Sequence, residues 1–281
     1  MSFTVRMARP EDVEHIVPWT TDTFDWGDYV PDRLPAWIED PSSAVVVCLD
    51  ESEIPVALAH ALLLSKTEAW LEAARVHPDY KRSGMGSAMN HAGVAWARER
   101  GAKVVRLATE ADNEAARRQV EALDYRQTSN WVHARYEIGP GSAKPGKPGL
   151  RPAPPSDVDA AWMFWSTSNL AHDSRGLIAH GWRWRKATPG DLATAAGEGN
   201  FYQSPAGWVV ADAPEEDRIR TLWLATTPEE APWLLADLID LASQKEATEL
   251  TIMMPNIPWV AEALSRSGAE SKEVVVYSLA L

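Results

Sequence analysis

Residues 68–87 constrain the fold of this 281-residue chain more than any other stretch. An apolar run is followed by a basic turn with Lys81, Arg82, Gly84 and Gly86, and then by a run of helix-forming residues. Glycines let successive backbone N–H groups converge, and a helix N-terminus adds partial positive charge. The order predicts a strand, an anion-binding turn and a helix. An ordinary strand–helix turn is the alternative reading of the two glycines alone.

The bulk properties indicate a globular protein long enough for two domains. Hydrophobic residues make up 45% of the chain. The apolar run at 55–64 contains His60 and is too short to span a bilayer, and the N-terminus lacks the apolar core of a signal peptide. Cys48 is the single cysteine and is expected to be buried, with no disulfide. We therefore predict a cytoplasmic protein without membrane contact.

The formal net charge of −13 argues against a nucleic-acid partner. It is compatible with attraction of a cationic amine, although solubility alone is the simpler explanation. The seven histidines show no metal-ligand spacing, so the sequence predicts no metal site. The oligomeric state is not predicted.

Strand and helix patterns alternate along residues 1–138 and predict an α/β (α+β) domain. Strands are expected at 4–8, 45–49, 56–64, 70–76, 103–109 and 131–138, and helices at 87–100 and 113–123. Residues 20–40 read as an irregular segment rich in acids and aromatics. Residues 139–149 are dense in proline and glycine and predict a linker.

After the linker the sequence starts again. The motif R-x-A-x-P-x-D-V at Arg6 returns 145 residues later at Arg151, and residues 102–107 lie over 247–252 at the same offset. These matches predict an internal duplication, with chance similarity of helix–strand patterns as the alternative.

The second copy lacks the glycine turn. At the common offset Gly84 and Gly86 fall on Glu229 and Ala231. A carboxylate there would repel an anion, so residues 150–281 are predicted to keep the fold without the binding site.

The segment V-x-P-x-Y-K-x-x-G-x-G, from Val76 to Gly86, resembles the acetyl-CoA pyrophosphate loop of GNAT superfamily N-acetyltransferases. That loop reads R/Q-x-x-G-x-G/A, and Lys81 stands here in place of Arg or Gln. The resemblance implies two tandem GNAT-like domains, each a mixed central sheet flanked by helices, with acetyl-CoA bound by residues 1–138. It implies acetyl-CoA contacts at Ala74, Arg75, Val76, Lys81, Arg82, Ser83, Gly84, Met85, Gly86 and Ser87. The backbone N–H near Ala74 or Arg75 would stabilise the oxyanion.

A second segment, beginning N-x-x-A at Asn113, resembles the GNAT pattern N-x-x-A-x-x-x-Y-x-x-x-G-F. Asn113 would then contact the pantetheine, although a helix N-cap is an equally good role. Val120 replaces the tyrosine that commonly protonates the departing thiolate. Water or another residue would supply that proton.

Glu72 is the predicted general base. It is a carboxylate inside an apolar strand, where burial would raise its pKa toward neutrality. Pairing with Arg75 or exposure to solvent is the alternative. Glu68 is a weaker candidate for the same role, and Glu110 or Asp112 could relay a proton through water.

Residues 20–40 are the predicted acceptor-binding segment, since the corresponding GNAT segment covers the acceptor cleft. Asp25, Trp26, Tyr29 and Trp37 combine carboxylate charge with ring faces suited to a cation. A loop that caps the core is the alternative.

The segment D-Y-V-P-D-R-x-x-x-W-x-x-D-P from Asp28, together with E-A-W-L-E-A-A-R-V-H-P from Glu68, resembles the histidine N-acetyltransferase-like branch of GNAT proteins. The resemblance implies acetyl transfer to a primary amine of a small molecule, such as the free amino acid histidine. A polyamine or a peptide amine is an alternative acceptor. A non-catalytic acyl-CoA-binding or scaffolding protein is the alternative function.

Overall fold

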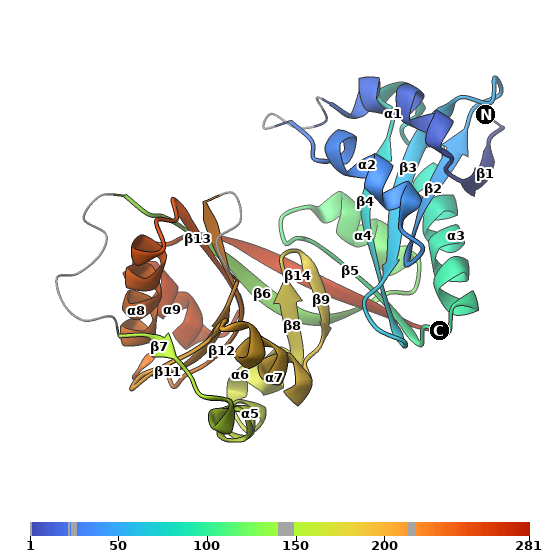
Figure 1. The fold of residues 1–281 in the computed structure, drawn as a ribbon. Coiled ribbons are helices and arrows are strands. Elements are labelled where there is room, and N and C mark those ends of the chain that lie inside the picture. The colour runs from blue at the N-terminus through green and yellow to red at the C-terminus, as the bar shows by residue number, and fades with distance from the viewer. Residues whose placement is uncertain (1, 22, 24–26, 140–148, 213–216) are drawn as a thin grey trace. The chain divides into compact units, whose positions relative to one another are not determined.

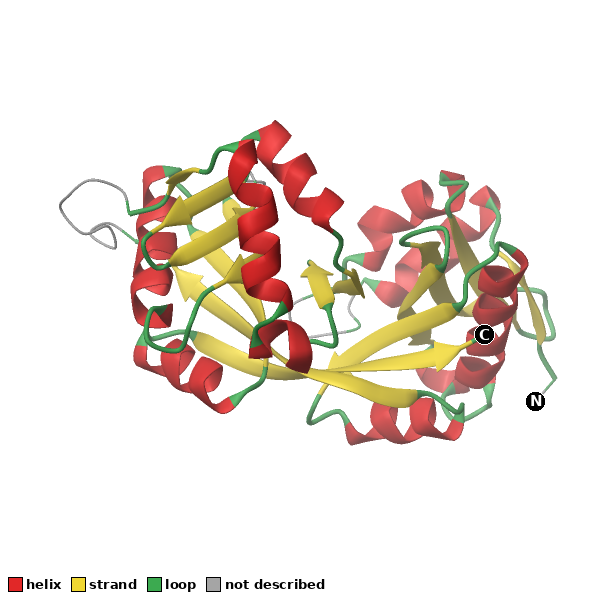
Figure 2. Ribbon diagram, turned by 90° about the horizontal axis from the view of Figure 1, so that it is seen from below, coloured by secondary structure: helices red, strands yellow, loops and turns green. Residues whose placement is uncertain are grey.

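The computed structural model describes residues 2–21, 23, 27–139, 149–212 and 217–281. The chain forms two compact units. Unit 1 comprises Met1–Leu107, Ala115–Arg126 and Tyr277–Leu281, and unit 2 comprises Ala108–Glu114 and Gln127–Val276. In each unit helices lie against a mixed sheet (Figures 1 and 2), which confirms the predicted α/β class.

The sheet strands of unit 1 follow the order β1-β2-β3-β4-β5. Neighbours from β1 to β4 are antiparallel, and β4 and β5 are parallel because α3 connects them. The elements from the N-terminus to β6 are β1 (Thr4–Met7), η1 (Pro10–Asp12), α1 (Val13–Thr20), α2 (Val30–Glu39), β2 (Ser43–Leu49), β3 (Pro55–Leu63), β4 (Glu68–Val76), η2 (Pro78–Tyr80), α3 (Met85–Glu99), β5 (Val104–Glu110), α4 (Glu114–Ala122) and β6 (Arg126–Glu137).

The central strands of unit 1 are apolar on both faces because helices cover both (Figure 1). On β2, Val45 and Val47 pack with α1 and α2, whereas Val46 and Cys48 pack with α3. Cys48 is buried, as predicted, and burial raises the pKa of its thiol to about 11.

The segment predicted to be irregular contains a helix, and that prediction was wrong. α2 buries Val30, Leu34 and Trp37 on one face, the i, i+4, i+7 spacing of an amphipathic helix. The prolines that obscured this pattern are tolerated here: Pro31 lies in the first turn, where the backbone N–H has no helical acceptor. The hydrogen bond that Pro35 cannot donate would have gone to the carbonyl of Pro31.

Unit 2 has the strand order β14-β6-β13-β12-β11-β10-β7 and one continuous apolar core. β12 and β13 are parallel, connected through α8, and β8 pairs with β9 as a separate hairpin. The elements after β6 are β7 (Arg151–Pro152), η3 (Pro155–Asp157), α5 (Val158–Ser166), α6 (Asn169–Asp173), β8 (Leu177–His180), β9 (Arg183–Lys186), α7 (Pro189–Glu198), β10 (Phe201–Ser204), β11 (Gly207–Ala211), β12 (Arg218–Ala225), α8 (Ala231–Gln244), β13 (Glu249–Pro255), α9 (Pro258–Arg266) and β14 (Glu270–Ala280).

The predicted repeat has a counterpart in the order of the elements. η1 and α1 begin at Pro10 and Val13, and η3 and α5 begin 145 residues later, at Pro155 and Val158. β5 and β13 are related by the same offset, and each follows a helix that connects two parallel strands. Within the described residues, no helix is both long and apolar enough to cross a membrane.

The compact units are discontinuous in sequence, whereas the predicted domains, 1–138 and 150–281, are consecutive. β6 continues from unit 1 into unit 2 at Gln127, and β14 returns to unit 1 at Tyr277. The Tyr277 side chain is 0% exposed and its hydroxyl donates to Oε1 of Glu121, at 2.9 Å. Nε of Arg117 donates to the same hydroxyl, at 3.2 Å. These contacts join the last five residues of the chain, which belong to unit 1, to α4 of the same unit.

We expect Tyr277→Ala to destabilise unit 1 by about 3–5 kcal/mol, because it removes a buried ring and leaves a cavity. Tyr277→Phe keeps the ring and should cost about 1–2 kcal/mol through the lost hydroxyl contacts. Urea unfolding of both variants, followed by tryptophan fluorescence, measures the difference. Equal stability of Tyr277→Ala and the parent chain would contradict this role of the C-terminal strand.

Candidate active site

β4 bends at a bulge that lies at the centre of the candidate site. Glu72 lies opposite His60 and Arg75 opposite Leu58, so β4 has two residues where β3 has one. Ala73, in the bulge, has a φ of +56°, a left-handed conformation that is unfavourable for a residue with a Cβ. The extra residue places Glu72 and Arg75 on the same face of the sheet.

The bulge also marks where β4 separates from β5. In the described part of the chain, the parallel register of these two strands covers residues 68–70 and stops before the bulge. Ala74, Arg75 and Val76, the residues predicted to meet the pantetheine, follow this point and precede the glycine turn. Their backbone groups therefore lie where β4 has left the register of its parallel neighbour.

Glu72 is hydrogen-bonded to His60 across the two strands. Nδ1 of His60 lies 2.9 Å from Oε1 of Glu72. The His60 side chain is 1% exposed and that of Glu72 is 14% exposed. An ionised carboxylate can only accept, so Nδ1 carries the hydrogen when Glu72 is charged. The predicted base is thus a partly exposed carboxylate held by a buried imidazole.

Aromatic rings of α2 and its N-cap surround this pair. The Trp37 ring stacks on His60, with ring centroids 4.2 Å apart and an interplanar angle of 10°. Tyr29 meets Trp37 edge to face at 6.0 Å and is 40% exposed. Burial, and next the negative charge of Glu72, raises the pKa of Tyr29. Of the predicted acceptor residues, Trp37 thus contacts the His60 partner of Glu72, and Tyr29 contacts Trp37.

An ion pair ties the start of α2 to β4. Nε of Arg75 donates to Oδ2 of Asp28 at 2.7 Å, and Nη2 donates to Oδ1 at 3.2 Å. Asp28 also accepts from the backbone N–H of Val30, and its side chain is 0% exposed. The guanidinium carbon of Arg75 lies 5.6 Å from the ring centroid of Tyr29. Because these two charges cancel, an ionised Glu72 gives the cluster a negative charge suited to a cationic amine.

The turn between η2 and α3 has the backbone of an anion site. Arg82 and Gly84 have φ values of +63° and +86°, and the Ser83 hydroxyl donates to the carbonyl of Tyr80 at 2.6 Å. Gly84 is the N-cap of α3, and its carbonyl accepts from Ala88 at 3.1 Å. The N–H groups of the first helical residues have no acceptor inside the helix and point toward this turn.

The space around the turn fits a phosphate group. A Cβ on Gly84 would meet no atom within 4 Å, and one on Gly86 would meet only the Gln119 side chain, at 2.5 Å from Nε2. Lys81 and Arg82 have exposed side chains. Open space, converging N–H groups and two cations together suit the pyrophosphate of a CoA molecule.

The residues on and beside α4 that match the second GNAT pattern differ in their structural roles. Tyr125 is 0% exposed and hydrogen-bonded to Asn90 at 3.2 Å, and burial raises its pKa to about 12. It is a core residue. Asp124 aligns with the glycine of the GNAT pattern that begins at Asn113, and its φ of +65° lies in the region that favours glycine. Val120 lies on α4, and Asn113 precedes that helix in unit 2.

Other residues named from the sequence are not placed beside Glu72 by the described structure. Asp25 and Trp26 lie outside the described residues, so their role in acceptor binding stays a prediction. Glu68, a weaker candidate base, forms a buried ion pair with Arg106 at 2.5 Å. Glu110 and Asp112, the candidates for proton relay, belong to unit 2.

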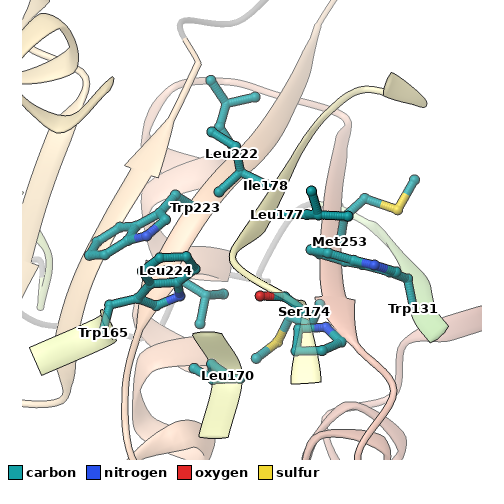
Figure 3. Close-up of a pocket in the computed structure, with 12 residues that line it drawn as sticks. Trp131, Trp165, Leu170, Ser174, Leu177, Ile178, Leu222, Trp223, Leu224 and Met253 are labelled. Atoms are coloured by element: carbon teal, nitrogen blue, oxygen red, sulfur yellow. The ribbon is translucent and has the colours of Figure 1, made fainter. Parts of the chain in front are cut away.

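In unit 2 the space beyond the parallel strand pair is filled. The register of β12 and β13 runs from Arg218 with Glu249 to Thr221 with Ile252. Beyond it, Figure 3 shows Trp165 and Trp223 on one side and Trp131 with Met253 on the other. They line a cavity of about 20 Å³, room for about one water molecule. The lining residues are Trp131, Trp165, Leu170, Ser174, Leu177, Ile178, Leu222, Trp223, Leu224, Met253, Met254 and Pro255.

The turn that precedes α8 differs from its counterpart before α3. Pro228, Glu229 and Glu230 are exposed, and Glu230 is the N-cap with a right-handed backbone. Two carboxylates beside the helix N-terminus satisfy its partial charge and would repel a phosphate.

Sequence reasoning missed His60, which it treated only as one of seven histidines without metal-ligand spacing. A single histidine inside the continuous apolar strand β3 was the available signal. A buried imidazole needs a hydrogen-bond partner, and the carboxylate of the neighbouring apolar strand was the candidate.

We expect Gly84→Asp to weaken CoA binding at least about tenfold, because it adds a carboxylate beside the pyrophosphate. Gly84→Asn is the matched control: asparagine tolerates a left-handed backbone and carries no charge. Titration calorimetry with CoA compares the two variants with the parent chain. Equal affinity of the aspartate variant and the parent chain would refute the loop assignment.

Comparison with known proteins agrees with this arrangement. Residues 13–125 match the family model described as "Acetyltransferase (GNAT) family". No curated protein matches the chain significantly. A GCN5-related N-acetyltransferase structure from Sphaerobacter thermophilus matches 99% of this chain and 95% of its own, with a TM-score of 0.69 and 14% identity.

Two further solved structures share the fold at similar distance. A candidate acetyltransferase from Thermoplasma acidophilum matches 99% of this chain and 100% of its own, with a TM-score of 0.61 and 18% identity. A candidate acetyltransferase from Pyrococcus horikoshii matches 99% of this chain and 89% of its own, with a TM-score of 0.58 and 15% identity. The family model thus covers residues 13–125, and the solved structures share the fold over almost the whole chain.

Proposed function

We propose that this protein transfers the acetyl group of acetyl-CoA to a primary amine of a small molecule. The observation that carries the proposal is the position of Glu72. Its carboxylate is 14% exposed, lies beside the bulge of β4, and belongs to the same strand that leads into the glycine turn. A base and a thioester-binding strand are thus contiguous, as direct transfer requires.

The reaction needs no covalent enzyme intermediate. The neutral amine attacks the thioester carbonyl, a C–N bond forms, and the C–S bond breaks to release CoA as a thiolate. Glu72 accepts the proton lost by the nitrogen, through a water molecule. The backbone N–H of Ala74 or Arg75 would donate to the oxyanion. The thiolate takes its proton from solvent, because Val120 occupies the position of the family's tyrosine.

The charge around Glu72 supports a cationic or neutral amine as acceptor. Asp28 and Arg75 neutralise one another, and the exposed ring of Tyr29, which packs on Trp37, provides apolar surface near the carboxylate. The branch resemblance makes a free amino acid such as histidine the first acceptor to test. Polyamines and peptide amines are the alternatives.

We expect Glu72→Gln to lower kcat about 10²–10⁴-fold, the usual contribution of a general base. The affinity for acetyl-CoA should change little, because the amide keeps the size of the side chain. Thiol release from acetyl-CoA, measured with the best amine of a panel of amino acids, polyamines and peptides, gives kcat as a function of pH. Glu99→Gln, at an exposed position on α3, is the control for loss of a carboxylate.

Two results would redirect the proposal. A Glu72→Gln variant that keeps the acidic limb of the pH–rate profile would assign the base elsewhere. Tight CoA binding without turnover of any amine would favour the non-catalytic acyl-CoA-binding alternative.

We expect one CoA site per chain, because the corresponding space in unit 2 is closed by tryptophans and its turn carries Glu229 and Glu230. The stoichiometry of a calorimetric titration with CoA measures this directly. If Gly84→Asp still bound one equivalent with the parent affinity, the site would lie outside the glycine turn.

A further inference from the structure

We infer that His60 is a positioning residue of the proposed acetyl-transfer site: it donates its Nδ1–H to Glu72 and holds that carboxylate ionised and in a fixed orientation. The inference rests on the proposed role of Glu72 as the base. It adds to that proposal a residue on a different strand that acts through the base without touching the substrate.

The hydrogen bond is built into the sheet. His60 and Glu72 are directly opposite on β3 and β4, immediately before the bulge, and Nδ1 lies 2.9 Å from Oε1. Directly opposed side chains leave the sheet on the same face. Their separation is therefore fixed by backbone register rather than by a flexible loop, as a positioning contact requires.

The surroundings of the ring favour one tautomer of His60. Among the described residues, Nε2 of His60 is buried without a hydrogen-bond partner. The carboxylate needs a hydrogen on Nδ1, and a second hydrogen on Nε2 would be a buried donor with no acceptor. The neutral tautomer with hydrogen on Nδ1 satisfies both conditions. His60 in this state is a donor to Glu72 and cannot take a proton at Nδ1.

Stacking fixes the plane of the imidazole. Trp37 covers one face of the ring at a centroid distance of 4.2 Å, almost parallel to it. His60 itself is 1% exposed, so solvent does not compete for the Nδ1 hydrogen. The contact thus has the low local dielectric in which a hydrogen bond to a charged group is strong.

The Glu72 side chain is 14% exposed. Oε1 accepts from His60, and a carboxylate has about four acceptor positions, so this bond uses only part of its capacity. Among the described residues, the ionisable groups near Glu72 include Arg75 on its own strand, which is paired with Asp28, and Tyr29 before α2.

Three substitutions separate positioning from packing. In His60→Asn the side-chain amide nitrogen would occupy the place of the imidazole Nδ1, since both atoms are bonded to Cγ, so this variant should retain the donor. His60→Gln places its amide one bond further out, and His60→Leu fills space without a donor. Thermal unfolding of all three variants identifies any that lose the fold.

We expect His60→Leu and His60→Gln to lower kcat about tenfold or more, with the KM for acetyl-CoA unchanged. The acidic limb of the pH–rate profile should move up by about one pH unit, because the ionised base has lost a donor. His60→Asn keeps the donor, so its kcat and its acidic limb should stay close to those of the parent chain. In a Glu72→Gln background, His60→Leu should have no further effect on kcat.

Nitrogen-15 NMR of histidine-labelled protein tests the tautomer without an acceptor. The signal that disappears in His60→Asn should be that of a neutral imidazole with hydrogen on Nδ1. A tautomer with hydrogen on Nε2 would overturn the inference. So would equal losses of kcat in all three variants with an unmoved acidic limb, while Glu72→Gln remains impaired. A fully active Glu72→Gln would instead remove the proposed base, and with it this role of His60.

Discussion

The arrangement of the candidate site depends on the bulge in β4. One extra residue at Ala73 puts Glu72 and Arg75 on one face of the sheet. On that face Trp37 of α2 stacks on His60, the partner of Glu72, and Asp28 pairs with Arg75. The left-handed backbone of Ala73 costs free energy, and it is held because Ala73 is packed in the core cluster with Val45 and Leu58. The packing of the apolar core thus holds Ala73 in a left-handed conformation that an alanine does not favour by itself.

β4 has a different structural role on each side of the bulge. Before it, β4 is in register with both neighbours and carries the buried pair Glu68 and Arg106. After it, β4 leaves the register of β5 and leads into the turn at Gly84. A strand that stays paired on one side and diverges on the other leaves room for an extended ligand while the fold remains closed elsewhere.

Local patterns predicted most of this from the sequence. The glycine turn, the strands of unit 1 and α3 follow from residue periodicity and turn chemistry, which act over a few residues. α2 was missed because Pro31 and Pro35 outweighed the apolar spacing of Val30, Leu34 and Trp37. The pairing of His60 with Glu72 was missed for another reason: it depends on strand register and on the bulge, and no local pattern encodes either.

The passage of β14 from unit 2 into unit 1 was equally invisible in the sequence, and it gives the second half of the chain a structural role in the first. β14 leaves unit 2 at Val276 and ends in unit 1, where Tyr277 is buried and bonded to α4. Loss of the second half would therefore remove part of the core of the first. Unit 2 does not depend on a glycine turn for stability, because tryptophans beside its parallel strands add buried apolar area. Of the two described turns before α3 and α8, the turn before α3 has the backbone and charges suited to a phosphate.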